Sequence, residues 1–142
     1  MLFRSVIDLS EGRLTPIKQD DSRATYCPPL SSEEGHFTWD MQASVIHNMV
    51  RALSSWPGAY TEAGDRKLKI YDTRVVDVLP DVADKTVAEQ AVSGTIVASK
   101  GENLIIKCGT GYIKILELQF AGGKRLNSRD VSHNYKPGQV FS

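Results

Sequence analysis

The sequence predicts a mainly β fold with one or two helices: a small antiparallel, OB-like barrel preceded by an extended connector and an amphipathic helix. Three observations predict it. Short apolar or alternating segments separated by glycine turns fill residues 59–119, which is typical of small antiparallel barrels. Residues 13–38 contain three prolines and no sustained hydrophobic period. The clearest helical period lies between these regions, at residues 40–54.

The chain opens with an amphipathic segment, whose spacing predicts a helix over residues 2–9 that ends at Glu11-Gly12. Its apolar side chains repeat on one helical face: Leu2, Phe3, Val6 and Ile7. A helix of two turns is marginal in water, so this face needs a packing partner. Leu2-Phe3-Arg4-Ser5 also matches the translation of a common sequencing-adapter end. We therefore expect a protein that extends further toward its N-terminus, and an apolar face that contacts little of this chain.

Residues 13–38 are expected to form an extended connector that lies along a surface. Pro16, Pro28 and Pro29 favour extended backbone. Unlike a flexible glycine-serine linker, this segment and the residue after it carry apolar side chains: Ile17, Tyr26, Leu30, Phe37 and Trp39. These side chains predict a strap that is anchored to neighbouring structure.

The strongest helical pattern spans residues 40–54. Asp40 stands where an N-cap residue is expected, and Trp56-Pro57-Gly58 ends the pattern. The apolar positions form one stripe: Val45, Ile46, Met49, Val50 and Leu53. We expect this stripe to pack against the strands that follow.

The rest of the chain has strand and turn patterns. Strand character begins at Ala59, is clear over residues 67–71 and continues at 75–78. Residues 79–93 are polar and acidic and are expected to form a loop. Three further strands are expected near residues 94–99, 103–108 and 112–119. In the last of them the alternation shifts at Ile115-Leu116, which predicts a β-bulge or a strand covered on both faces.

Length and composition restrict the class of protein. The 142 residues suffice for one domain, with 41% apolar and 24% charged residues. No apolar run approaches ~18 residues, so no membrane span is expected. Cys27 and Cys108 lie far apart without a CxxC motif, which argues against a structural zinc site or a disulfide framework and favours the reducing cytoplasm.

The charge is unevenly distributed, although the formal net charge is zero. Residues 94–142 hold seven basic and three acidic residues, whereas residues 1–93 hold ten basic and fourteen acidic residues. Such an asymmetry is typical of a surface that faces a polyanion. A surplus of this size is equally compatible with an ordinary solvated surface, so it needs support from a motif.

No catalytic motif is legible in the sequence. His36, His47 and His133 are scattered over connector, helix and tail, and Gly109-Thr110-Gly111 lacks the GK[ST] of a P-loop. Gly122-Gly123-Lys124-Arg125 has the composition of a phosphate cradle, although solvated cations on a tight turn are the commoner explanation of such a segment. We expect neither a catalytic residue nor a metal site in this chain.

Three segments in order resemble the C-terminal domain of methionyl-tRNA formyltransferases. Residues 19–26, QDDSRATY, are similar to the family's Q-D-E-S-x-A-T-Y connector. Residues 46–61, IHNMVRALSSWPGAYT, are similar to its I-H-N-x-I-R-A-L-x-P-W-P-G-A-Y-T. Residues 116–126, LELQFAGGKRL, are similar to its L-E-L-Q-P-A-G-G-K-R-M, and Pro137-Gly138 matches its closing P-G. The ordered set covers nearly the whole chain.

The sequence departs from the family pattern in two places. Ser55 stands where the family usually has proline, and residues 130–135 form a shorter segment than usual, which predicts a stunted terminal helix. The family's catalytic Asn, His and Asp and its S-L-L-P motif belong to an N-terminal Rossmann-like domain, to which no residue here corresponds. The resemblance implies that residues 1–38 are a remnant of that domain's last helix plus the interdomain connector. Residues 39–142 would then be the C-terminal barrel domain.

The resemblance implies the tRNA-binding part of an enzyme that transfers a formyl group from 10-formyltetrahydrofolate to the amino group of initiator methionyl-tRNA in translation initiation. Such acyl transfer needs a general base and a stabilised oxyanion, both of which the resemblance places in the missing domain. The chain alone is therefore expected to be inactive and to bind no cofactor. Its expected partners are initiator methionyl-tRNA and the missing catalytic domain, in a cytoplasmic, monomeric protein.

Lysine and arginine side chains would grip the tRNA by its phosphates, which give affinity and register without sequence specificity. The first candidates stand at the Gly-Gly turn, where a phosphate can approach closely: Lys124 and Arg125. The second lie on the helix and on one strand face, where a solvated side chain is the commoner outcome: Arg51, Lys67 and Lys69. Trp56 and Tyr60 could stack on bases, although core packing beside the turn is favoured.

Two other functions stay open. The chain could belong to another folate-dependent formyltransferase or hydrolase, of the nucleotide-sugar or formyl-folate type, although the LQ-x-AGGKR segment at residues 118–125 favours the tRNA enzyme. It could also be a free-standing binding module, which the apolar helical face at residues 2–7 disfavours.

Overall fold

The computed structural model describes residues 2–54 and 56–141. The strands are β1 (Ala59–Ala63), β2 (Arg66–Val76), β3 (Ile96–Lys100), β4 (Asn103–Lys107), β5 (Tyr112–Phe120) and β6 (Leu126–Asn127). The α-helices are α1 (Leu2–Ser10), α2 (Ala43–Ala52), α3 (Lys85–Gln90) and α4 (Ser128–Val131). Short 3₁₀ turns lie at Asp21–Arg23, Glu33–Gly35 and Ser132–Asn134. None of the helices in the described chain combines the length and the apolarity needed to cross a bilayer.

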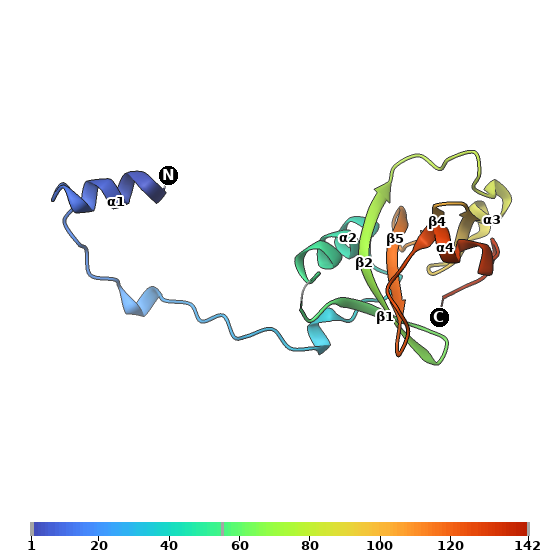
Figure 1. The fold of residues 1–142 in the computed structure, drawn as a ribbon, viewed down its shortest axis with the longest axis horizontal. Coiled ribbons are helices and arrows are strands. Elements are labelled where there is room, and N and C mark those ends of the chain that lie inside the picture. Colours follow the sequence, from blue (N-terminus) through green and yellow to red (C-terminus); the bar gives the residue numbers. More distant parts are fainter. Residues whose placement is uncertain (1, 55, 142) are drawn as a thin grey trace.

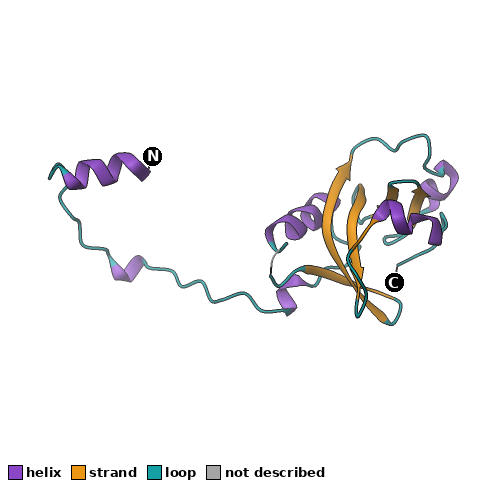
Figure 2. Cartoon of the chain, viewed as in Figure 1, coloured by secondary structure: helices purple, strands orange, loops and turns teal. Residues whose placement is uncertain are grey.

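The strands form one antiparallel sheet, which confirms the predicted mainly β fold (Figure 2). Their order is β1-β2-β5-β4-β3, and β6 pairs with the second half of β5. The long strands β2 and β5 are the centre of the sheet, with α2 on one side and α4 near the opposite end (Figure 1). β1 and β3 are the two edge strands in this order. Among the described residues, no pairing between these two strands closes the sheet into a barrel.

β5 carries the bulge that its sequence predicts. Ile115 and Glu117 lie opposite the consecutive β2 residues Thr73 and Asp72, so Leu116 is the extra residue. A residue inserted in one strand exchanges the inner and outer positions beyond it. The bulge therefore explains the shift in alternation at this point.

The terminal helix α4 has four residues and is as short as predicted.

The main core lies between the inner face of the sheet and α2. Ile46 and Val50 of α2 are fully buried, whereas Val45, at the edge of the predicted stripe, is 44% exposed. The sheet contributes a set of branched side chains to this core: Leu68, Ile70, Ile96, Leu104, Ile106, Ile113, Ile115 and Leu118. The burial of these apolar side chains, at about 25 cal/mol per Å², is the main stabilisation of the fold.

α2 begins at Ala43, and the prediction that Asp40 caps it was wrong. Gln42 occupies the cap position without a side-chain hydrogen bond. The preceding backbone is instead paired with the β4–β5 connection. The N–H of Ala43 donates to the Thr110 carbonyl at 3.0 Å, and the N–H of Gly109 donates to the Trp39 carbonyl at 2.8 Å. These bonds hold the chain extended up to Gln42, so the helix starts only beyond them.

The expected loop at residues 79–93 contains a helix, α3. The Asp84 side chain accepts a hydrogen bond from the backbone N–H of Val87 at 3.0 Å and so caps it. Ala88 is buried in a second cluster on the outer face of the sheet, together with Val97, Ala98 and Ile105. A helix of six residues is too short for its hydrophobic period to be recognised among polar neighbours. The local signal for it is a capping residue, Asp84, followed by the apolar pair Val87-Ala88.

Replacing Asp84 with alanine is expected to lower the free energy of unfolding by about 1 kcal/mol, because the Val87 N–H loses its acceptor. Urea unfolding followed by circular dichroism measures this change. Asp81→Ala removes an exposed carboxylate from the same segment and is the matched control. Equal unfolding midpoints for the two variants would contradict the capping role.

Residues 13–34 run as an exposed, extended segment between α1 and the sheet (Figure 1). The predicted strap is confirmed only at its end, where Phe37 and Trp39 are 0% and 5% exposed. There the N–H of Phe37 donates to a β1 carbonyl at 2.9 Å. The other three predicted anchors are exposed: Ile17, Tyr26 and Leu30. The connector therefore becomes part of the sheet domain only where its backbone reaches β1.

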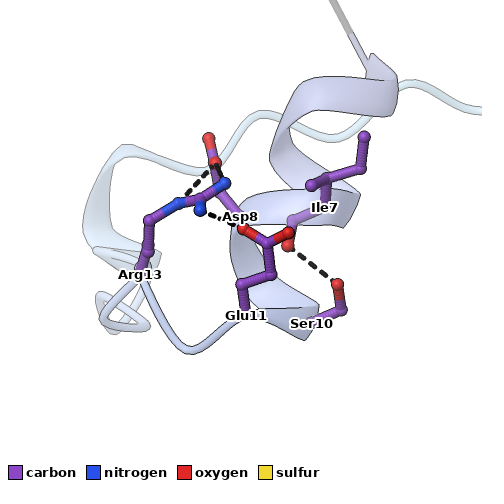
Figure 3. Close-up of polar contacts among 5 residues, drawn as sticks. All are labelled: Ile7, Asp8, Ser10, Glu11 and Arg13. Carbon is purple, nitrogen blue, oxygen red and sulfur yellow. Dashed lines mark hydrogen bonds and ion pairs between the residues drawn. The ribbon is translucent and has the colours of Figure 1, made fainter.

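α1 has an exposed apolar face, as predicted, formed by Phe3, Val6 and Ile7. The side chain of Leu2 lies outside the described part. The end of the helix is defined by polar contacts (Figure 3): Arg13 donates to Asp8 at 2.6 Å and pairs with Glu11, and the Ser10 hydroxyl donates to the carbonyl of Ile7 at 2.8 Å. Exposed contacts of this kind contribute little to stability. Local polar contacts rather than packing therefore shape the end of α1.

Candidate nucleic-acid interface

The glycine turn between β5 and β6 is fixed against β2. The N–H of Gly123 donates to the Phe120 carbonyl at 2.8 Å, which closes the turn. Gly122 has a φ of +75°, in the left-handed region that favours glycine. The N–H of Ala121 donates to the Lys67 carbonyl at 2.9 Å. The turn is therefore held beside the first residues of β2.

Lys67 and Lys69 share the outer face of β2, as predicted, because Leu68 and Ile70 are buried on the inner face. The two lysines and the turn border a hollow of about 220 Å³, which is completed by Gln119, Phe120, Ala121 and Gly122. None of these lining residues is acidic. The hollow is large enough for a phosphate group, with the two lysine side chains along one side and the glycine turn on the other.

The lysines of this face keep their charge available. Lys67 Nζ lies 3.6 Å from the centroid of the Tyr60 ring, a cation–π contact that orients the side chain without neutralising it. Lys124 is exposed on the turn. Over residues 2–54 and 56–141, Lys67, Lys69 and Lys124 form no ion pair with a carboxylate. Their charges can therefore act on an approaching anion.

Arg125 is held differently from the lysines. Its guanidinium pairs with the Glu117 carboxylate of β5, and its Cζ lies 4.2 Å from the centroid of the Tyr71 ring on β2. The structure thus places Lys67, Lys69 and Arg125 on the outer face of β2, with Lys124 exposed on the adjoining turn. Arg125 alone among these four carries its own counter-ion in the described chain.

Arg51 is the fifth predicted residue and lies on α2, outside the lining of the hollow. It is exposed, and its Nε donates to Asn48 at 3.0 Å within the same helix. The nearby His47 ring bonds to the buried Thr73 hydroxyl at 2.9 Å, which ties α2 to β2. His47 is thus a packing residue, as expected of a lone histidine.

Sequence reasoning missed the polar residues that support this face. The Tyr71 hydroxyl donates to Gln119 Oε1 at 2.6 Å, and Gln119 Nε2 donates to the Gly123 carbonyl at 2.8 Å. The only sequence signal is alternation, which places these residues on the same outer faces as Lys69 and Glu117. Their pairing depends on a register between strands that are far apart in the chain.

The aromatic side chains at the start of β1 are not packed as expected. Trp56 was favoured as a core residue, but it is 61% exposed. Tyr60 is half-buried and contacts the His36 ring, with centroids 5.3 Å apart, as well as Lys67. Burial at this end of the domain is supplied by Phe37 instead, which is 0% exposed.

The described residues contain no cluster of histidine, cysteine or carboxylate side chains that could hold a metal ion. Cys27 is exposed, and Cys108 is buried. Burial raises the pKa of the Cys108 thiol to about 12, so it stays protonated at neutral pH and is a poor nucleophile.

Comparison with known proteins identifies similar chains. The family model described as "Formyl transferase, C-terminal domain" matches residues 29–136. A methionyl-tRNA formyltransferase of Caldicellulosiruptor saccharolyticus is 37% identical over 133 residues, which are 92% of this chain and 40% of that protein. One of Pelobacter propionicus is 39% identical over 128 residues, covering 90% of this chain and 37% of the relative. The chain thus spans about two fifths of the length of these curated relatives.

Among solved structures, HypX from Aquifex aeolicus in complex with tetrahydrofolic acid is similar, with a TM-score of 0.63. The sequence identity is 16%, and the match covers 92% of this chain and 22% of that one. At this identity the likeness concerns the fold alone.

Proposed function

The chain belongs to the formyl transferase C-terminal domain family, and from this premise we propose that it is the tRNA-binding part of a methionyl-tRNA formyltransferase. The whole protein would transfer a formyl group from 10-formyltetrahydrofolate to the amino group of initiator methionyl-tRNA. The catalytic groups would belong to a domain that precedes residues 39–142, with residues 1–38 as the end of its last helix and the connector. We place this protein in the cytoplasm as a monomer.

The observation that carries the proposal is the basic hollow beside the glycine turn. Lys67 and Lys69 border it, Lys124 stands on the adjoining turn, and none of the three is paired with a carboxylate in the described chain. Ammonium groups in this arrangement bind RNA phosphates as point charges and release counter-ions, which gives affinity without base specificity. Of the remaining candidates, Arg51 would add positive potential from α2, whereas Arg125 carries its own counter-ion, Glu117.

The hollows of the described residues bear on where the formyl donor would bind. One hollow, of about 570 Å³, is open and has a mainly apolar lining with Arg66 as the charged residue. A pterin ring presents N–H groups along one edge, and the side-chain acceptors that line this hollow are neutral: Asn134, Tyr135 and Gln139. We therefore assign the donor to the proposed catalytic domain, and the role of this chain is to hold the tRNA while the reaction occurs there.

A formyltransferase or hydrolase that does not use tRNA is the second candidate. The fold of HypX, which was crystallised with tetrahydrofolic acid, supports this possibility. The sequence favours the tRNA enzyme, because relatives at 33–39% identity are named methionyl-tRNA formyltransferases, whereas HypX is 16% identical.

The test is binding of initiator tRNA by the purified chain, followed by fluorescence anisotropy over a range of salt concentrations. We expect weak binding whose log K falls with log salt by roughly 2–3, because each of about three phosphate contacts contributes ~0.7–0.9 to the slope. Other tRNA species should bind similarly, since phosphate contacts position the RNA and do not read it. No measurable binding at about 50 mM salt would contradict the proposal and favour the second candidate.

A further inference from the structure

We infer that Arg125 is a positioning residue, held by Glu117 and Tyr71, and that it fixes the glycine turn without binding a phosphate itself. The inference deepens the proposed function and rests on it for the identity of the ligand. It assigns the phosphate contacts on this face to the lysines and gives the arginine of the turn a different role.

Arg125 is engaged on two sides. The Glu117 carboxylate pairs with its Nη2, and the Tyr71 ring covers one face of the guanidinium at 4.2 Å. A phosphate that approached the remaining N–H groups would also approach Glu117, whose negative charge repels it. The side chain of Glu117 is 31% exposed and that of Arg125 is 52% exposed, so this repulsion is only partly screened by solvent.

The residues that contact Arg125 are connected to the glycine turn or to the residue just after it. Tyr71, beneath the guanidinium, donates to Gln119, and Gln119 donates to the carbonyl of Gly123. On the other side, Glu117 lies opposite Asn127 of β6, just after the turn. The turn is thus fixed at Gly123 by Gln119 and at its last residue by the Arg125–Glu117 pair. We call these four side chains the latch: Tyr71, Glu117, Gln119 and Arg125.

Among the described residues, the neighbouring lysines have no such ion-pair partner. Glu62 lies opposite Lys67 in the β1–β2 pair but bonds to the His36 ring at 2.7 Å. The ion pair of Glu102 is made to Lys114 on β5, at 3.3 Å. Lys67 also interacts electrostatically with the exposed Glu33, but without an ion pair. Arg125 thus has an ion-pair partner, whereas Lys67, Lys69 and Lys124 have none among the described residues.

The experiment measures the salt slope of tRNA binding in the wild-type chain and three variants. Lys124→Ala should reduce the slope by ~0.7–0.9, the contribution of one phosphate contact. The double variant Glu117→Ala/Arg125→Ala conserves net charge, and it should weaken binding several-fold, because the turn loosens, with an unchanged slope. Glu117→Gln frees the guanidinium, and it should make the slope steeper by ~0.7–0.9.

Two results would overturn the inference. The first is a double variant that loses as much slope as Lys124→Ala, since Arg125 would then be a phosphate ligand. The second is an unchanged slope in Glu117→Gln, since Glu117 would then not be restraining Arg125. A merely structural role for Glu117 does not produce a steeper slope, and circular dichroism of each variant verifies that it is folded.

A failure of the proposed function is distinguishable from a failure of the latch. If the wild-type chain binds no tRNA, the proposed function fails, and the latch is tested without ligand by exchange of the Arg125 Nη–H protons with water in NMR spectra. The exchange should be several-fold faster in Glu117→Gln than in the wild type. Glu62→Gln, which loses a carboxylate bonded to His36, should leave it unchanged. Equal exchange rates in the Glu117→Gln and Glu62→Gln variants would overturn the inference.

Discussion

Replacing Lys67 and Lys69 together with alanine is expected to lower the salt slope of tRNA binding by about 1.4–1.8, because two phosphate contacts are lost. The corresponding loss of affinity at ~0.1 M salt is roughly 25- to 60-fold. The reason is the hollow between these side chains and the glycine turn, whose lining contains no carboxylate. The measurement is the anisotropy titration at several salt concentrations.

The matched control is the double variant Lys100→Ala/Lys107→Ala, which removes the same net charge elsewhere on the sheet. Lys100 is exposed at the end of β3, and Lys107 Nζ lies 4.8 Å from the centroid of the Tyr112 ring. Neither lines the hollow. We expect these substitutions to change the slope much less. Equal losses in the two double variants would mean that only total charge matters, and the assignment of a defined phosphate site would be wrong.

Gly109→Ala is expected to lower the free energy of unfolding by about 3 kcal/mol or more, because a Cβ at this position has no space. It would lie 1.8 Å from the carbonyl oxygen of Asp40, and that carbonyl is backbone, so it cannot rotate away. The N–H of Gly109 also donates to the carbonyls of Trp39 and Met41, at 2.8 and 3.0 Å. The substitution therefore disrupts the pairing that joins the end of the connector to the β4–β5 connection.

Urea unfolding of Gly109→Ala and Gly123→Ala compares the two sites. The nearest atom to a Cβ at Gly123 is the Phe120 carbonyl oxygen at 3.2 Å, a contact that a small shift relieves. Neither glycine has the positive φ that would strain an alanine, so the comparison isolates the effect of space. We expect a change of under about 1 kcal/mol for Gly123→Ala. Similar unfolding midpoints would show that the Asp40 segment can move, contrary to this prediction.

The elements with a clear hydrophobic period could be predicted from the sequence. The stripe of α2 and the strands of the sheet follow from it, and so does the bulge at Leu116, because inserting one residue changes the parity of buried positions. The start of α2 and the existence of α3 could not. Each depends on a long-range partner, Thr110 for the segment before α2 and the outer face of β3 and β4 for Ala88. Local preference alone does not reveal such partners.

The candidate site could be predicted in part for the same reason. Alternation places Lys67 and Lys69 on one strand face, and the glycine pair places Lys124 on a turn. Their proximity depends on the antiparallel register that sets Lys69 opposite Gln119. The pairing of Glu117 with Arg125 also depends on where β5 turns back into β6. The residues could therefore be proposed separately, but the difference between free lysines and a neutralised arginine required the structure.

The exposed segment of residues 13–34 has a consequence for affinity. At ~3.3–3.6 Å per residue its fully extended length is about 70–80 Å, a reach comparable with the dimensions of an RNA ligand. In the proposed function, a domain joined to the sheet domain through such a tether would make the second contact with a shared RNA intramolecular, at an effective concentration set by the length and stiffness of the tether. Under the proposed function, a phosphate site of only a few lysines, too weak to retain a free RNA at physiological salt, would then be occupied for most of the time that the other domain is bound.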